Sequence, residues 1–148
     1  MREAHFKVIS VNISDIKGTK KRPVESIELI EDFGIKGDAH AGKGLRQVSL
    51  LADKDIEKMR KMGLELAYGD FAENITTKGI DLSALPVGTR LNIGTAVLEV
   101  SQIGKTCHGE KCEIFNKAGD CIMPKKGIFA RVIKGGVIKN EDSGYYSF

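Results

Sequence analysis

The sequence predicts a mainly β protein of the α+β class: a closed or nearly closed β-barrel with a few peripheral helices. Seventeen glycines are scattered between short runs of β-branched and apolar residues, a pattern typical of strands joined by tight turns. Turn signals recur roughly every 8–12 residues, which gives about six to eight short strands. One segment alone has the apolar spacing of a helix. This pattern favours a barrel over alternating β-α-β units.

The expected strands follow from runs rich in β-forming residues. We expect the residues from 141 onward to be loosely ordered. The strand segments are 6–14, 26–31, 47–52, a strand and turn over 71–82, a hairpin over 89–103 that turns at Gly94 and Thr95, and a hairpin over 127–140 that turns at Gly135 and Gly136.

The helix is expected over residues 53–66. Ile56, Met59 and Leu66 fall at helical spacing, and Asp53 is of a type that caps helix N-termini. Gly63 is expected near the C-terminal end of the helix.

The length and composition indicate one domain over residues 1–148. A net charge of +3, 6% aromatic residues and no Trp argue against a nucleic-acid-binding protein. No apolar run approaches the roughly 20 residues of a membrane span. The N-terminus lacks the apolar centre of a signal peptide, so we expect a cytoplasmic protein with no membrane partner.

All three cysteines lie in one segment, GKTCHGEKCEIFNKAGDC, at 104–121. Cys107, Cys112 and Cys121 with His108 form a set that zinc accepts, although the C-x2-C spacing of most structural zinc sites is missing. Their odd number indicates reduced thiols rather than a disulfide framework. Cys112 and Cys121 can equally be small buried apolar residues.

Cys107 differs from the other two cysteines in its surroundings. It follows a predicted strand, and Lys105, His108 and Lys111 lie close to it in sequence. Neighbouring cations lower the pKa of a thiol and favour the thiolate, which attacks electrophiles and binds metals. Cys107 is therefore the candidate residue for chemistry.

Two loops and one strand carry candidate anion-binding groups. GDAHAGKGLRQVSL at 37–50 places His40, Lys43 and Arg46 on a glycine-rich loop, which lets the backbone approach a phosphate closely. A solvated surface loop is the alternative. Asn74 and Thr76 offer polar groups in GDFAENITTKGIDL, or hold a turn through their own side chains. Arg131 interrupts an apolar strand, and the pattern favours its solvent face.

Taken in order, these motifs resemble the MOSC domain, named for the C-terminal region of molybdenum cofactor sulfurases. The matching blocks are GDAHAGKGLRQVSLL, then GDFAENITTKGIDLSALPVGTRLNIGTAVLEVSQIGKTCH, then KKGIFARVIKGG. The resemblance covers roughly residues 5–140, which it implies are the core of a single MOSC-like domain over 1–148. The resemblance implies a β-barrel with a few helices. It also implies binding of the molybdenum cofactor, a molybdenum–pterin dithiolene with a phosphate tail, or transfer of sulfur to a metal.

The resemblance assigns a role to each candidate. It makes Cys107 the molybdenum ligand or the carrier of a persulfide. It implies that Arg46, Asn74, Thr76 and Arg131 cradle the pterin and its phosphate, with Lys43 and His40 in the same first loop.

The resemblance leaves the activity open. The chain would act as a cofactor or sulfur carrier, or as the catalytic part of a reductase of N-hydroxylated compounds. Its partners would be a cysteine desulfurase, a molybdopterin-processing protein or an electron donor, and no pyridoxal phosphate is expected in this chain alone. The alternative is a non-catalytic zinc or interaction domain built on Cys107, His108, Cys112 and Cys121.

Overall fold

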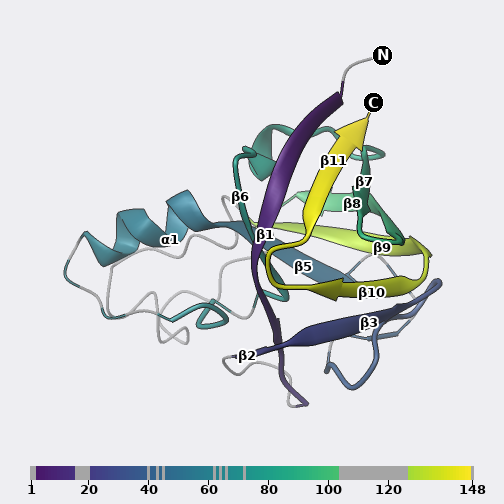
Figure 1. Cartoon of the computed structure of the whole chain (residues 1–148), viewed down its shortest axis with the longest axis horizontal. Helices are drawn as coiled ribbons and strands as arrows, with labels where there is room; N and C mark the ends of the chain where they lie inside the picture. The colour runs from purple at the N-terminus through teal and green to yellow at the C-terminus, as the bar shows by residue number, and fades with distance from the viewer. Residues whose placement is uncertain are drawn as a thin grey trace.

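The computed structural model describes residues 3–15, 21–39, 41–42, 44, 46–61, 63, 65, 67–71, 73–103 and 127–147. These residues form eleven strands, one α-helix and one 3-10 helix (Figure 1). The elements are β1 (Glu3–Ile13), β2 (Arg22–Val24), β3 (Ser26–Ile30), β4 (Gly34–Ile35), β5 (Val48–Ala52), α1 (Asp53–Arg60), β6 (Ile75–Lys78), η1 (Leu82–Ala84), β7 (Arg90–Ile93), β8 (Ala96–Ile103), β9 (Ile128–Lys134), β10 (Gly136–Lys139) and β11 (Ser143–Ser147).

Seven strands close into a barrel. Their order is β11-β7-β8-β9-β5-β6-β1, and β1 pairs with β11 to complete the ring. Strands β5 and β6 run parallel, whereas the other pairs are antiparallel, so the barrel is mixed. A second sheet, β10-β3-β4, lies below the barrel in Figure 1. The predicted mainly β barrel is therefore confirmed.

Alternation along the strands fills the barrel interior. In β9, Ile128, Ala130 and Val132 belong to the hydrophobic core. Successive side chains of a strand point to opposite faces, so Phe129 and Arg131 point outward from the barrel. The same reasoning places Ser49 and Thr76 outward, because their neighbours in β5 and β6 are core residues.

Helix α1 is shorter than predicted and begins differently. It spans Asp53–Arg60 rather than 53–66, with Ile56 and Met59 buried as the spacing indicated. The N-cap is Ala52, which makes no side-chain capping bond, so the predicted cap at Asp53 is wrong. The reason is that strand β5 runs directly into the helix and leaves no residue between them. Asp53 already lies in the first turn, where its charge still complements the helix dipole.

The predicted hairpin over 127–140 is wrong, although both of its strands exist. Strand β9 pairs with β8 and β5, whereas β10 leaves the barrel and pairs with β3. Glycine is needed at the junction for close packing rather than for a turn. A Cβ on Gly135 would lie 2.6 Å from the carbonyl oxygen of Leu29, and one on Gly136 would lie 2.4 Å from Oγ1 of Thr95.

The C-terminal residues are ordered, contrary to the prediction. Strand β11 pairs with both β1 and β7 and so closes the barrel. Gly144 permits this closure, because a Cβ there would lie 2.5 Å from the ring of Phe6. None of the helices in the described part of the chain is long and apolar enough to cross a membrane.

Candidate functional site

Arg46 and Arg131, far apart in sequence, share the outer face of the barrel. The guanidinium of Arg46 lies 5.4 Å from the ring centroid of Phe129, a cation–π contact, and its Nε donates a hydrogen bond to Oε1 of Gln102 (3.3 Å). Gln102 and Phe129 are partners across β8 and β9. Arg131 lies two residues beyond Phe129 and points to the same side. Arg46 is exposed and Arg131 is half-buried, so both remain accessible.

This arrangement lies where the chain leaves the barrel toward the cysteine segment. Strand β8 ends at Ile103, directly after the residue that holds Arg46. Cys107 follows a few residues later in the sequence. The barrel therefore brings the Arg46 loop to the base of the segment that carries the candidate thiolate.

Several predicted residues lie outside the part of the chain that the structure describes. They are Cys107, His108, Cys112 and Cys121, together with His40 and Lys43 of the glycine-rich loop. Within the described ranges, no group of three or more His, Cys, Asp or Glu side chains could hold a metal ion. The choice between a cofactor ligand and a zinc set at these cysteines therefore remains a prediction.

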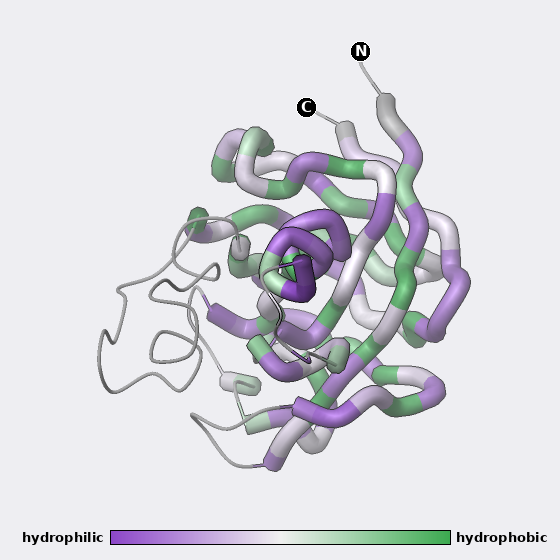
Figure 2. The backbone as a smooth tube through the Cα atoms, turned by 90° about the vertical axis from the view of Figure 1, so that its left-hand side faces the viewer, coloured by the Kyte–Doolittle hydropathy of each residue, from purple (hydrophilic) through white to green (hydrophobic). Residues whose placement is uncertain are grey.

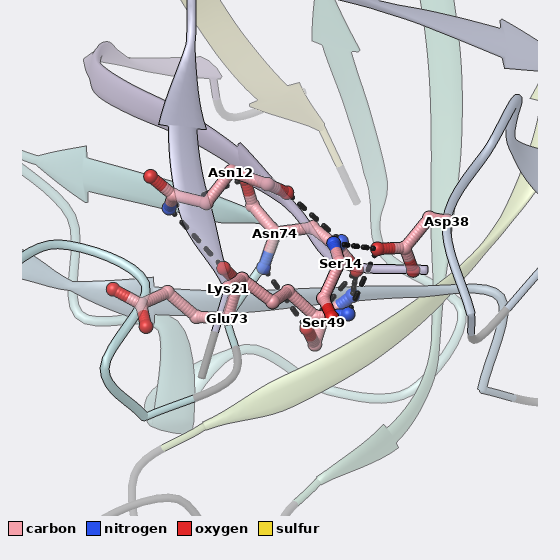
Figure 3. A network of polar contacts seen from close by, with 7 residues as sticks. All are labelled: Asn12, Ser14, Lys21, Asp38, Ser49, Glu73 and Asn74. Atoms are coloured by element: carbon pink, nitrogen blue, oxygen red, sulfur yellow. Dashed lines mark hydrogen bonds and ion pairs between the residues drawn. The ribbon is translucent and has the colours of Figure 1, made fainter. Parts of the chain in front are cut away.

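Asn74 is fully buried and ties three strands together (Figure 3). Its Oδ1 accepts hydrogen bonds from the backbone N–H of Ser49 (3.0 Å) and from the Ser49 hydroxyl (3.1 Å). Its Nδ2 donates to the carbonyl oxygen of Asn12 (3.1 Å), and Nδ2 of Asn12 donates to the carbonyl of Glu73 (3.1 Å). Buried polar groups are costly unless paired, so this network fixes the relative positions of β1, β5 and β6.

Thr76 is also fully buried, and its hydroxyl donates a hydrogen bond to the carboxylate of Glu73. Oε2 of Glu73 accepts hydrogen bonds from the Thr76 hydroxyl and from the N–H of Gly69, both at 3.0 Å. Oε1 accepts from the N–H of Phe71 (3.2 Å). Burial raises the pKa of Glu73, and these hydrogen bonds oppose the rise. The carboxylate thereby holds the loop that precedes β6 in one conformation.

A buried ion pair anchors the glycine-rich loop, and sequence reasoning missed it. Nζ of Lys21 lies 2.8 Å from Oδ1 of Asp38, and the two side chains are only 1% and 0% exposed. The same oxygen accepts a hydrogen bond from the N–H of Ser14 (3.1 Å), and the N–H of Ala39 donates to the carbonyl of Ser14 (2.7 Å). Lys21 belongs to a run of basic residues that resembles a solvated surface, so its burial could not be predicted from the residue pattern.

The comparisons with solved structures agree with this architecture. The YuaD protein from Bacillus subtilis superposes with a TM-score of 0.82 at 19% identity, covering 99% of this chain and 98% of that chain. YiiM from Geobacillus stearothermophilus gives 0.69 at 20% identity, covering 97% and 75%. YiiM from Escherichia coli gives 0.67 at 18% identity, covering 96% and 70%. At these identities the likeness shows the fold.

The sequence comparisons give a more specific result. Among curated proteins, none matches this sequence. The family model of the MOSC domain matches residues 37–144, which include the glycine-rich loop, the Asn74 region, the cysteine segment and strands β9 and β10. The chain therefore belongs to the MOSC domain family, which is linked to binding of the molybdenum cofactor.

Proposed function

We propose that this protein binds the molybdenum cofactor beside Arg46 and Arg131, on the outer face of β8 and β9, with Cys107 as its sulfur ligand or as the carrier of a persulfide. The observation that carries the proposal is the convergence of Arg46 and Arg131 beside the end of β8, where the chain leads toward Cys107. Membership of the MOSC family supports the molybdenum cofactor as the ligand. The positive charges of Arg46 and Arg131 suit its anionic phosphate.

The two arginines suit the anionic tail of the cofactor. A guanidinium is planar, always charged and matched to phosphate oxygens. Stacking on Phe129 and the bond to Gln102 hold the Arg46 guanidinium in place, so less rotational freedom is lost when an anion binds. When bound, the cofactor would supply a metal centre that changes oxidation state. Lys43 and His40 of the same loop would add donors.

Asn74 and Thr76 take a different part in the proposal from the one the resemblance implied. Their hydrogen bonds run to Ser49, Asn12 and Glu73 inside the barrel wall. We therefore assign them as positioning residues, which hold β5 and β6 so that Arg46 and Arg131 share one face. The buried pair of Lys21 and Asp38 does the same for the loop.

The proposed chemistry of Cys107 depends on its thiolate. As a ligand, the thiolate would bind the metal directly while a separate donor supplied electrons for reduction of N-hydroxylated compounds. As a carrier, the thiolate would attack the outer sulfur of a partner's persulfide. A new S–S bond would form on Cys107, and the partner's thiolate would leave. A cysteine desulfurase is the class of partner that supplies such sulfur.

The proposal is tested by loading the purified protein with free molybdenum cofactor under anaerobic conditions. Unbound cofactor is removed, and retained molybdenum and pterin fluorescence are measured. Loss of one charge-assisted bond corresponds to about 1.5–3 kcal/mol, so Arg46→Gln should weaken retention roughly tenfold or more. Arg22→Gln, an exposed arginine on β2, is the matched control and should retain the cofactor. Equal weakening by the two variants would contradict a site at Arg46.

A zinc site is the competing outcome of the same preparation. Four zinc-compatible side chains lie within 107–121 in the sequence. Stoichiometric zinc in the purified protein, with no retained molybdenum, would replace the cofactor proposal with a structural metal domain.

A further inference from the structure

A pocket lies at the end of the barrel, between α1 and the residues that follow β6. Its volume is about 640 Å³, within the range of small-molecule sites. It opens where the parallel strands β5 and β6 end, beside the paired residues Ala52 and Thr77. Ligands of sheets with parallel strands commonly bind at the carboxyl ends of the strands. None of the residues proposed above to bind the cofactor lines this pocket.

The rim of the pocket is rich in lysine. Helix α1, seen end-on near the centre of Figure 2, is largely hydrophilic. Exposed lysines line the rim together with three carboxylates. Among the ion pairs of the described chain, Asp81 pairs with Lys54 (3.8 Å) and Glu57 pairs with Arg60. The lysines beyond these pairs are Lys58, Lys61 and Lys78.

These three lysines face a single remaining carboxylate of the lining, that of Asp53. The balance of charge at the pocket is therefore positive. Ammonium groups with free rotation bind phosphate as point charges. The charge distribution favours an anionic ligand.

Two residues that line the same pocket carry buried polar atoms with unmet hydrogen bonds. Thr77 is fully buried, and its Oγ1 has no hydrogen-bond partner; Oδ1 of Asp53 is buried in the same way. They are the two buried side-chain N or O atoms left unpaired in the described residues, and both belong to residues that line the pocket. Native proteins seldom leave such atoms unpaired, so their placement together points to a ligand.

The two atoms also restrict the chemistry of that ligand. A carboxylate oxygen only accepts hydrogen bonds, so Asp53 needs a donor such as a hydroxyl. The Thr77 hydroxyl both donates and accepts. A ligand that satisfies both atoms therefore carries hydroxyl groups as well as a negative charge.

We propose that this pocket binds a small phosphate monoester of a polyhydroxylated compound. Lys58, Lys61 and Lys78 hold the phosphate at the rim, and ligand hydroxyls reach Asp53 and Thr77 in the wall. The site shares no proposed binding residue with the cofactor face, so it is tested on protein without molybdenum cofactor. Failure here leaves the proposed function untouched.

Binding is measured by calorimetry with three probes: ribose 5-phosphate, inorganic phosphate and ribose. We expect ribose 5-phosphate to bind at least tenfold more tightly than inorganic phosphate, and inorganic phosphate more tightly than ribose. The triple variant Lys58→Gln, Lys61→Gln, Lys78→Gln should weaken ribose 5-phosphate binding tenfold or more. The control, which removes the same charge away from the pocket, is the triple variant Lys36→Gln, Lys134→Gln, Lys139→Gln, whose three lysines are exposed and do not line the pocket.

Thr77→Val supplies a readout that does not depend on charge. Valine keeps the shape of the side chain and removes the unpaired hydroxyl. We expect the melting temperature of the free variant to equal or exceed that of the wild type, and its affinity for ribose 5-phosphate to fall at least fivefold. A lower melting temperature would show that the hydroxyl is already satisfied and would overturn the proposal. Absence of binding by the wild type, or equal weakening by the control triple variant, would also overturn it.

Discussion

Replacing Lys21 with Met tests the buried ion pair between Lys21 and Asp38, which anchors the glycine-rich loop. Methionine keeps the length and apolar stem of lysine but removes the ammonium that lies 2.8 Å from Oδ1 of Asp38. Because both side chains are at most 1% exposed, water cannot replace the lost partner. The carboxylate then stays buried after losing the ammonium at 2.8 Å, which is costly.

The expected loss follows from this burial. Breaking a buried ion pair by removing one partner costs about 3–5 kcal/mol, a large part of the roughly 5–15 kcal/mol that stabilises a typical domain. The double variant Lys21→Met, Asp38→Asn removes the charge from both positions. We expect it to be more stable than Lys21→Met alone, because the buried negative charge is removed together with the ammonium that faced it.

The assay is equilibrium unfolding in urea, followed by circular dichroism. Lys7→Met is the matched control, since Lys7 and Glu141 form an exposed pair (3.7 Å, side chains 52% and 83% exposed). Such a surface pair contributes at most about 1 kcal/mol. If Lys21→Met costs no more than Lys7→Met, the reasoning from burial is wrong.

Two further predictions concern the loop before β6. Burial raises the pKa of Glu73, so the folded state holds its proton more tightly than the unfolded state. The difference in unfolding free energy between the wild type and Glu73→Gln is therefore expected to depend on pH. It should fall as the pH rises from about 4.3, the ordinary glutamate pKa, toward the raised pKa of Glu73. A difference that stays constant between about pH 4 and 7 would contradict this expectation. Gly69 has φ +94°, and a Cβ there would lie 2.2 Å from the carbonyl oxygen of Lys21. Gly69→Ala should therefore lower the free energy of unfolding in urea by about 3 kcal/mol or more, from backbone strain and steric overlap together. Gly63→Ala, with φ +93° and open space around it, should cost only about 1 kcal/mol; equal costs would show that the overlap is relieved.

The parts of the fold that sequence predicted correctly are those set by local pattern. The alternation in 89–103, with glycine between two apolar runs, gave β7 and β8 with the correct turn. The predictions were wrong where a strand is stabilised by pairing with strands that are distant in the sequence. Strand β11 is polar and short, and it is stabilised by backbone pairing with β1 and β7. Strand β10 follows β9 directly but pairs with β3, more than a hundred residues earlier in the chain.

The candidate site divides in the same way. Arg46 and Arg131 were selected through the family resemblance, and their binding role stays a prediction. The structure places both on one outer face. For Asn74 and Thr76 the sequence left two interpretations open, groups that bind a ligand or groups that hold a turn. Their burial in internal hydrogen-bond networks agrees with the second. A polar side chain in sequence gives no signal of whether protein or solvent satisfies it. Lys21 was missed for the same reason, since its partner lies 17 residues away.

The central claim is that the Cys107 sulfur holds the molybdenum cofactor. Molybdenum retained per chain after anaerobic loading, measured for the wild type, Cys107→Ser and Cys112→Ser, tests it most directly. We expect near-stoichiometric retention by the wild type, loss in Cys107→Ser and at most a modest reduction in Cys112→Ser. Equal retention by the wild type and Cys107→Ser, or equal loss in the two variants, would contradict a site that depends on the single sulfur of Cys107.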